Sequence, residues 1–177
     1  MWRAGILGPE ARVELLDGII TEKMGNGPAH DLVVRLLLLL FVQRLGGRHA
    51  IGTQSSVDPG PNSRPEPDLW VSRQADPAHR DALVDRDNLL LVVEVADSSL
   101  ARDRDVKLPL YAAAGIPEYW IADVNEEAVT VYTAPRPSPE LPGRDFTYDT
   151  EQRYGVGATI THALVGDVSV AAVFGRG

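Results

Sequence analysis

The chain has 177 residues and a formal net charge of −8, with 17 lysines and arginines against 25 aspartates and glutamates. This length predicts one domain with a substantial core. The sequence contains no cysteine, which excludes disulfides and thiolate metal sites. The acidic balance argues against a protein that holds nucleic acid on a broad basic surface.

Two features of the sequence bear on its location. The most apolar stretch, residues 32–42, is eleven residues long and contains Arg35, so it is too short to span a bilayer. The N-terminus has no basic stretch followed by an apolar core, which a secretory signal would have. We therefore expect a cytoplasmic protein with no membrane partner.

The pattern of apolar residues predicts an α/β protein with a mixed central β-sheet flanked by few helices. A hairpin with an Asp17-Gly18 turn is expected near the N-terminus. Residues 29–45 are expected to form a helix that is apolar on nearly every side, and therefore buried in the core or in a subunit interface. Strands are expected at residues 50–57, 68–72, 89–95, 118–123 and 128–133.

The second half of the chain is expected to contain one more helix, over residues 98–114. Because Pro109 removes a helical hydrogen bond, this helix should begin near Arg104 or be kinked. Three other segments complete the chain: a polar connection at 74–88, a surface loop with four prolines at 134–144, and a last thirty residues with one or two strands and a small terminal element. We expect residues 1–177 to form a single domain, extended by the hairpin at 12–24 and the β-rich segment 128–177.

Two carboxylates lie at the edges of apolar runs that read as buried strands. Asp68 begins D-L-W-V, and Glu94 lies within L-L-L-V-V-E-V-A; both are costly places for an unpaired carboxylate. On neighbouring strands the two would repel each other unless a divalent cation or a shared proton lay between them. Lys107 is one of only two lysines, and lysine can transfer a proton whereas arginine cannot. Together these residues point to metal-assisted hydrolysis of a phosphodiester.

Each of these residues also has a structural interpretation. Asp68 follows a proline and is of a type that ends a turn and caps a strand. Asp103, Lys107 and Tyr111 share one helical face, so Asp103 and Lys107 could form an ordinary surface pair worth tenths of a kcal/mol. Glu94 is the hardest to explain in this way, since a carboxylate that faces the core must be paired or bound to a metal.

Three stretches of the sequence resemble a known family. They are E-P-D-L-W-V at 66–71, the segment 91–123 that begins L-V-V-E-V-A-D, and the V-E-L-L-D-G hairpin with the helix that opens at His30. The chain resembles the Uma2 family of restriction endonucleases, in the PD-(D/E)xK nuclease superfamily. The resemblance implies a restriction-endonuclease-like core and a site that uses Mg²⁺ or Mn²⁺.

The resemblance also implies roles for individual residues. Asp68 matches the aspartate of the motif and Glu94 its second acidic residue, and with the Val95 backbone carbonyl they are expected to hold the metal. The usual lysine position is Ala96 here, and Lys107 fits a lysine that has migrated to the next helix. Arg102 stands where relatives often have an aromatic residue. Five further residues are candidate accessory groups near the site: Glu14, His30, Gln54, Asp103 and Tyr111.

We therefore expect a metal-dependent endonuclease that hydrolyses phosphodiester bonds of nucleic acid, with DNA as the favoured substrate. A homodimer is favoured, because duplex cleavage needs two sites or two events. The alternative is a catalytically silent nuclease fold that acts as a homo-oligomeric binding or scaffold protein, which the acidic balance and the apolar helix favour. A third possibility is metal binding without turnover.

Overall fold

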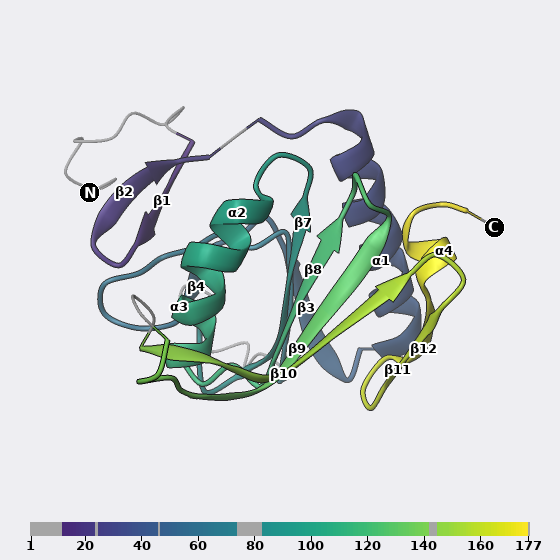
Figure 1. Cartoon of the computed structure of the whole chain (residues 1–177). Helices are drawn as coiled ribbons and strands as arrows, with labels where there is room; N and C mark the ends of the chain where they lie inside the picture. The colour runs from purple at the N-terminus through teal and green to yellow at the C-terminus, as the bar shows by residue number, and fades with distance from the viewer. Residues whose placement is uncertain (1–11, 24, 46, 74–82, 142–144, 177) are drawn as a thin grey trace.

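A six-stranded mixed β-sheet forms the centre of the computed structural model, which describes residues 12–23, 25–45, 47–73, 83–141 and 145–176. Strands β7 and β8 are parallel, and every other neighbouring pair in this sheet is antiparallel. The expected α/β fold with a mixed central sheet is confirmed (Figure 1). In spatial order the strands are β10 (Phe146–Gly155), β9 (Ala128–Pro137), β8 (Glu118–Asp123), β7 (Leu89–Ala96), β5 (Leu69–Arg73) and β3 (His49–Thr53).

In the described part of the chain, one long helix, three short helices and three two-stranded sheets surround the central sheet. The sheets pair β1 (Val13–Leu16) with β2 (Ile19–Glu22), β4 (Val57–Asp58) with β6 (Val84–Asp85), and β11 (Thr159–His162) with β12 (Gly166–Ser169). The helices are α1 (Pro28–Leu45), α2 (Leu100–Arg102), α3 (Leu108–Ala113) and α4 (Val170–Val173), with a π-helical turn at Asp103–Lys107 between α2 and α3. None of the helices in the described ranges is long and apolar enough to cross a bilayer.

The sheet separates two apolar layers, with α1 on one face and α2–α3 on the other (Figure 1). On β7, Val93 and Val95 pack in the layer of α1, whereas Val92 and Ala96 pack in the layer of α3. Because side chains alternate along a strand, Glu94 lies on the same face as Val92 and Ala96. The alternation therefore directs the Glu94 carboxylate toward the helical segment 100–113.

The helical segment after β7 begins at Leu100 and accommodates Pro109 without breaking. The Leu108 N–H donates to the Asp103 carbonyl, which widens the turn before the proline into a π-helical turn. Proline lacks an N–H and clashes with the carbonyl four residues earlier, and a wider turn relieves that conflict. The helix thus does not begin near Arg104; a widened turn accommodates the proline instead. Asp103 and Lys107 of this turn are both buried.

The N-terminal hairpin and most strands match the sequence prediction, and Asp17 and Gly18 adopt the positive φ angles, 48° and 82°, of a type I′ turn. The strand expected at 50–57 is wrong in its extent. Strand β3 ends at Thr53, because Gln54 adopts a positive φ of 45° and turns the chain. The connection expected at 74–88 contains the short strand β6, and residues 74–82 lie outside the described residues.

The proline-rich loop expected at 134–144 is wrong for its first four residues. Strand β9 continues to Pro137, and its pairing with β10 extends to that residue, whereas its pairing with β8 ends at Thr133. Beyond Thr133 one edge of β9 is therefore free, and prolines are tolerated on such an edge. The last thirty residues contain more strand than expected, since β10, β11 and β12 all precede α4.

The close approach of β3 to Trp70 generates a stability prediction. Gly52 lies opposite Trp70 in the register of β3 and β5, and a Cβ at Gly52 would overlap the indole ring. Gly52→Ala should lower the free energy of unfolding by roughly 1–3 kcal/mol, as overpacking does, measured by urea denaturation. Gly155→Ala is the matched control, because a Cβ on that strand glycine meets no atom within 4 Å. Equal stability of the two variants would contradict the packing at Gly52.

Candidate functional site

The register of β5 and β7 brings the two predicted carboxylates together. Leu69 pairs with Val93 in this antiparallel ladder, so the next step along both chains places Asp68 opposite Glu94. Asp68 lies just before β5, and its carboxylate accepts a hydrogen bond from the Val95 N–H at 2.8 Å. The aspartate therefore caps the ladder, as its structural interpretation proposed, and faces the same end of the sheet as Glu94.

His30 approaches the other oxygen of Asp68. Its Nε2 lies 3.1 Å from Asp68 Oδ1, and its Nδ1 lies 3.3 Å from Asp31 Oδ1. Burial lowers the pKa of His30, but the hydrogen bonds and charges of Asp68 and Asp31 outweigh burial and raise the pKa above its usual value. His30 is buried in the first turn of α1 and links the start of this helix to Asp68.

Glu94 is held by two donors from the helical segment that follows its strand. Lys107 Nζ and the Tyr111 hydroxyl each donate to Glu94 Oε1 at 2.9 Å. Burial raises the pKa of Glu94 to about 8, and Lys107 offsets only part of this effect. Burial likewise raises the pKa of Tyr111 well above its usual value, so its hydroxyl stays a donor.

Lys107 lies between two buried carboxylates. Besides Glu94 it contacts Glu14 of β1, with 3.2 Å between Nζ and Oε2. Burial lowers the pKa of Lys107, but Glu94, Glu14 and Asp103 together raise it above the usual value. Lys107 is therefore a fixed ammonium in this structure, and it pairs with these carboxylates rather than forming a surface pair.

Asp103 completes the buried acidic groups. It is almost fully buried, and the Ser99 hydroxyl donates to its Oδ2 at 2.6 Å. Burial raises the pKa of Asp103, while Lys107 and Ser99 act in the opposite direction. The Tyr119 hydroxyl donates to the Asp103 carbonyl at 3.2 Å, which ties the π-helical turn to the sheet.

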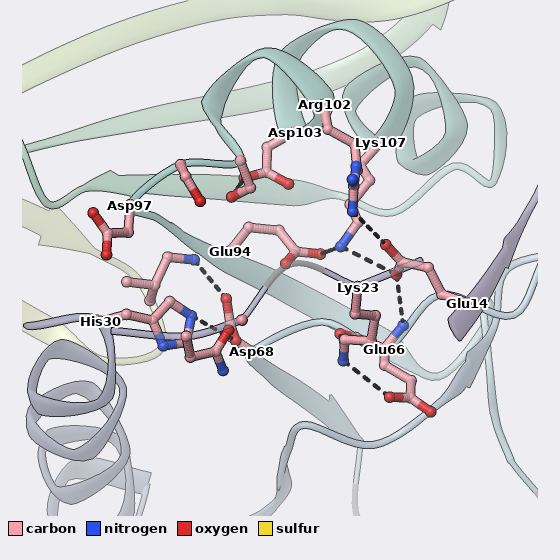
Figure 2. A pocket seen from close by; sticks show the side chains of 15 residues that line it. Glu14, Lys23, His30, Glu66, Asp68, Glu94, Asp97, Arg102, Asp103 and Lys107 are labelled. Atoms are coloured by element: carbon pink, nitrogen blue, oxygen red, sulfur yellow. Dashed lines mark hydrogen bonds and ion pairs between the residues drawn. The ribbon is translucent and has the colours of Figure 1, made fainter. Parts of the chain in front are cut away.

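The acidic and basic side chains at the centre of this cluster line one cavity of about 50 Å³ at the end of the central sheet (Figure 2); they are Glu14, His30, Asp68, Glu94, Asp103 and Lys107. Asp68, Glu94 and Lys107 are 9%, 3% and 4% exposed, so the cavity is recessed below the surface. Three parts of the chain that are far apart in sequence meet here. They are the β1–β2 hairpin with the start of α1, the residues just before β5, and β7 with the segment after it. The lining residues are Glu14, Lys23, Gly25, Asn26, His30, Glu66, Asp68, Glu94, Val95, Asp97, Ser98, Ser99, Arg102, Asp103 and Lys107.

Two of the candidate accessory residues do not line the cavity. Gln54 has an exposed side chain, and only its backbone N–H contacts the site, by donating to the Asp68 carbonyl at 3.2 Å. Tyr111 lies beneath Glu94 and acts through its hydrogen bond to that carboxylate. In contrast, Glu14, His30 and Asp103 all reach the cavity.

Sequence reasoning gave no role to several residues of the cavity wall. Lys23 Nζ pairs with Glu66 Oε2 at 2.9 Å, and Arg102 Nη1 donates to the Glu22 carbonyl at 3.0 Å and lies 3.9 Å from Glu14 Oε1. One signal was available, since Lys23 is the only other lysine in the chain.

The family model described as "Putative restriction endonuclease", Uma2, matches residues 3–152. The chain belongs to the Uma2 family. None of the curated proteins matches it. Among solved structures it is similar to a crystal structure described as "a putative nuclease belonging to DUF820 from Anabaena variabilis". The identity is 12%, the match covers 98% of this chain and 96% of that one, and the TM-score is 0.70. At this identity the likeness establishes a shared fold.

The raised pKa values generate a prediction for the Uma2 chain without metal. The pKa of Glu94 in the folded protein is about 8, above its ordinary value of 4.5. The stabilisation that this shift contributes is therefore complete below pH 4.5 and is lost as the pH rises to about 8. The shifts of Asp103 and His30 have the same sign. In the presence of a chelator, the free energy of unfolding should fall between pH 5 and 9 by on the order of a few kcal/mol.

Glu94→Gln should flatten this pH dependence, because the amide does not ionise. Glu22→Gln is the matched control, since Glu22 lies on the nearby hairpin with an exposed side chain, and it should keep the wild-type slope. Urea denaturation at a series of pH values provides the measurement. A Glu94→Gln slope equal to that of the wild type would contradict the environment described for Glu94.

Proposed function

We propose that this chain is a metal-dependent endonuclease that hydrolyses phosphodiester bonds of nucleic acid, with DNA as the substrate. One observation carries the proposal: Asp68 and Glu94 face each other at the end of the sheet, and Lys107 lies 2.9 Å from Glu94 in the same cavity. Membership of the Uma2 family supports it. The same three residues were expected from the sequence to carry the chemistry.

The donors in the cavity fit a hard divalent cation such as Mg²⁺ or Mn²⁺. Asp68 and Glu94 offer carboxylate oxygens and Val95 a backbone carbonyl, and Glu94 engages Lys107 and Tyr111 through Oε1 alone. Within the described ranges, no three acidic or histidine side chains are grouped to hold a metal. Mg²⁺ commonly takes one or two carboxylates and keeps several waters. When bound, the cation would stabilise negative charge that develops on the phosphate.

The residues of the chain have separate roles in this proposal. Lys107 supplies a positive charge beside the phosphate, and its raised pKa makes it a poor proton acceptor. Tyr111 and Lys107 hold the Glu94 carboxylate in place by donating hydrogen bonds to its Oε1. His30 orients Asp68 through one oxygen, while the Val95 N–H holds the other. The site is thus organised before a substrate arrives, which is what electrostatic catalysis requires.

We also propose that the protein is a cytoplasmic homodimer. The outward face of α1 supports a dimer, because Leu32, Leu39 and Val42 are 40%, 55% and 52% exposed and their spacing places them on one side of the helix. The sequence predicted an α1 that is apolar on nearly every side, and the structure buries only one of its faces. The opposite face is available to a second copy of the chain.

A silent scaffold is the second candidate, and one observation favours it. The chain supplies its own cationic partners to both carboxylates, Lys107 to Glu94 and His30 to Asp68. A paired carboxylate needs no metal for stability. A scaffold would therefore keep its fold, and the pairing of these side chains, without any divalent cation. It would not cleave nucleic acid.

Substitution of the three central residues tests the proposed activity. Asp68→Asn, Glu94→Gln and Lys107→Met should each lower Mg²⁺-dependent cleavage by roughly 100-fold or more, since each removes a charge from the site. Gel assays with plasmid DNA, single-stranded DNA circles and an RNA transcript provide the measurement. Asp87→Asn is the control, because that side chain is 91% exposed, and it should cleave as the wild type does. Full activity in all three site variants would refute the assignment.

A further inference from the structure

The recess of the cavity limits the shape of a substrate. Asp68, Glu94 and Lys107 lie below the surface, and the space above them is about 50 Å³, enough for a few water molecules. Duplex DNA is a stiff rod with a persistence length of about 50 nm. A rod of this kind reaches groups on an open face far more easily than groups in a recess. A single strand is flexible enough to turn one phosphodiester inward.

The charge of the lining limits the number of phosphates that can be held. Six acidic side chains face four basic ones, Lys23, His30, Arg102 and Lys107. Two of the basic groups are already held, Lys107 by Glu94 and Glu14, and His30 by Asp68. A duplex carries about one phosphate charge for every 1.7 Å of its axis. The chain has a net charge of −8, so it would repel most of these phosphates. This balance favours a strand that contacts the protein through very few phosphates.

Lys23 and Arg102 are able to make those contacts. They lie on one wall of the cavity, where the hairpin meets α2, and their side chains are 21% and 23% exposed (Figure 2). Lys23 pairs with the partly exposed Glu66, and such pairs contribute less than about 1 kcal/mol. Arg102 uses one guanidinium nitrogen, Nη1, for the Glu22 carbonyl at 3.0 Å and for the longer contact with Glu14 Oε1 at 3.9 Å. A guanidinium has five N–H donors, so others are left for a phosphate. A phosphate can therefore replace or join these partners at low cost.

We infer that the cavity takes single-stranded nucleic acid and that Lys23 and Arg102 hold phosphates of this strand at its mouth. The inference rests on the proposed nuclease function, and it adds the substrate class and two binding residues to it. With only two phosphate contacts, the binding constant for the strand should depend only weakly on salt concentration. For single strands the slope of log K against log salt concentration is about −0.7 per phosphate, so the expected slope is about −1.4.

Binding of a labelled oligonucleotide without turnover tests the inference. Fluorescence anisotropy is measured with the full chain, a fluorescein-labelled oligo-dT strand of about 20 nucleotides and its duplex with oligo-dA, at fixed Ca²⁺ and about 20–200 mM salt. The single strand should bind at least about tenfold more tightly than the duplex, which corresponds to about 1.4 kcal/mol. Lys23→Gln and Arg102→Gln should each reduce the slope to about −0.7.

Arg153→Gln is the matched control. Arg153 lies on β10, pairs with Glu126 at 3.7 Å and is 52% exposed, so this variant loses one surface charge away from the cavity and should keep the wild-type slope. Duplex binding as tight as single-strand binding, unchanged slopes in both cavity variants, or no binding of either probe would each overturn the inference. The nuclease function fails on a separate result, namely the absence of Mg²⁺-dependent cleavage by the wild type. Cleavage that survives substitution of Asp68, Glu94 and Lys107 would refute the assignment of these residues.

Discussion

A carboxylate buried within an apolar strand sets the requirements that the rest of the site meets. Glu94 lies on β7 with only 3% exposure, and a buried carboxylate without partners would cost several kcal/mol. Lys107 and Tyr111, in the helical segment that follows the strand, both donate hydrogen bonds to Glu94 and offset this cost. Lys107 also contacts Glu14 of β1. The ammonium that pairs with Glu94 thus ties the N-terminal hairpin to the site.

The backbone places these groups through two local devices. The β5–β7 register sets Asp68 opposite Glu94, one step beyond the last paired residues. The π-helical turn at 103–107 admits Pro109 and buries Asp103 together with Lys107. Such widened turns are frequent at functional sites. The charged side chains of this cluster hold one another in place. The same arrangement is therefore compatible with a nuclease that binds a metal and with a scaffold that does not.

The sequence was sufficient to predict the local features of the fold and insufficient for contacts between distant segments. The hairpin followed from Asp17-Gly18, and the burial of Glu94 followed from its apolar neighbours. The pairings of His30 with Asp68 and of Glu14 with Lys107 join residues 38 and 93 positions apart. Periodicity and propensity do not determine such pairings, because they depend on how the layers pack. The early end of β3 at Gln54 was missed for a similar reason, since a positive φ in a non-glycine residue leaves little trace in the sequence.

The most direct test of the account is whether Asp68 and Glu94 form one cation site. Isothermal titration calorimetry with Mn²⁺, in the absence of nucleic acid, measures this on the wild type, Asp68→Asn, Glu94→Gln and the exposed control Asp87→Asn. The account predicts binding in the wild type and the control, and loss of binding in both site variants. No binding by the wild type at millimolar Mn²⁺, or binding that persists in both site variants, would contradict it.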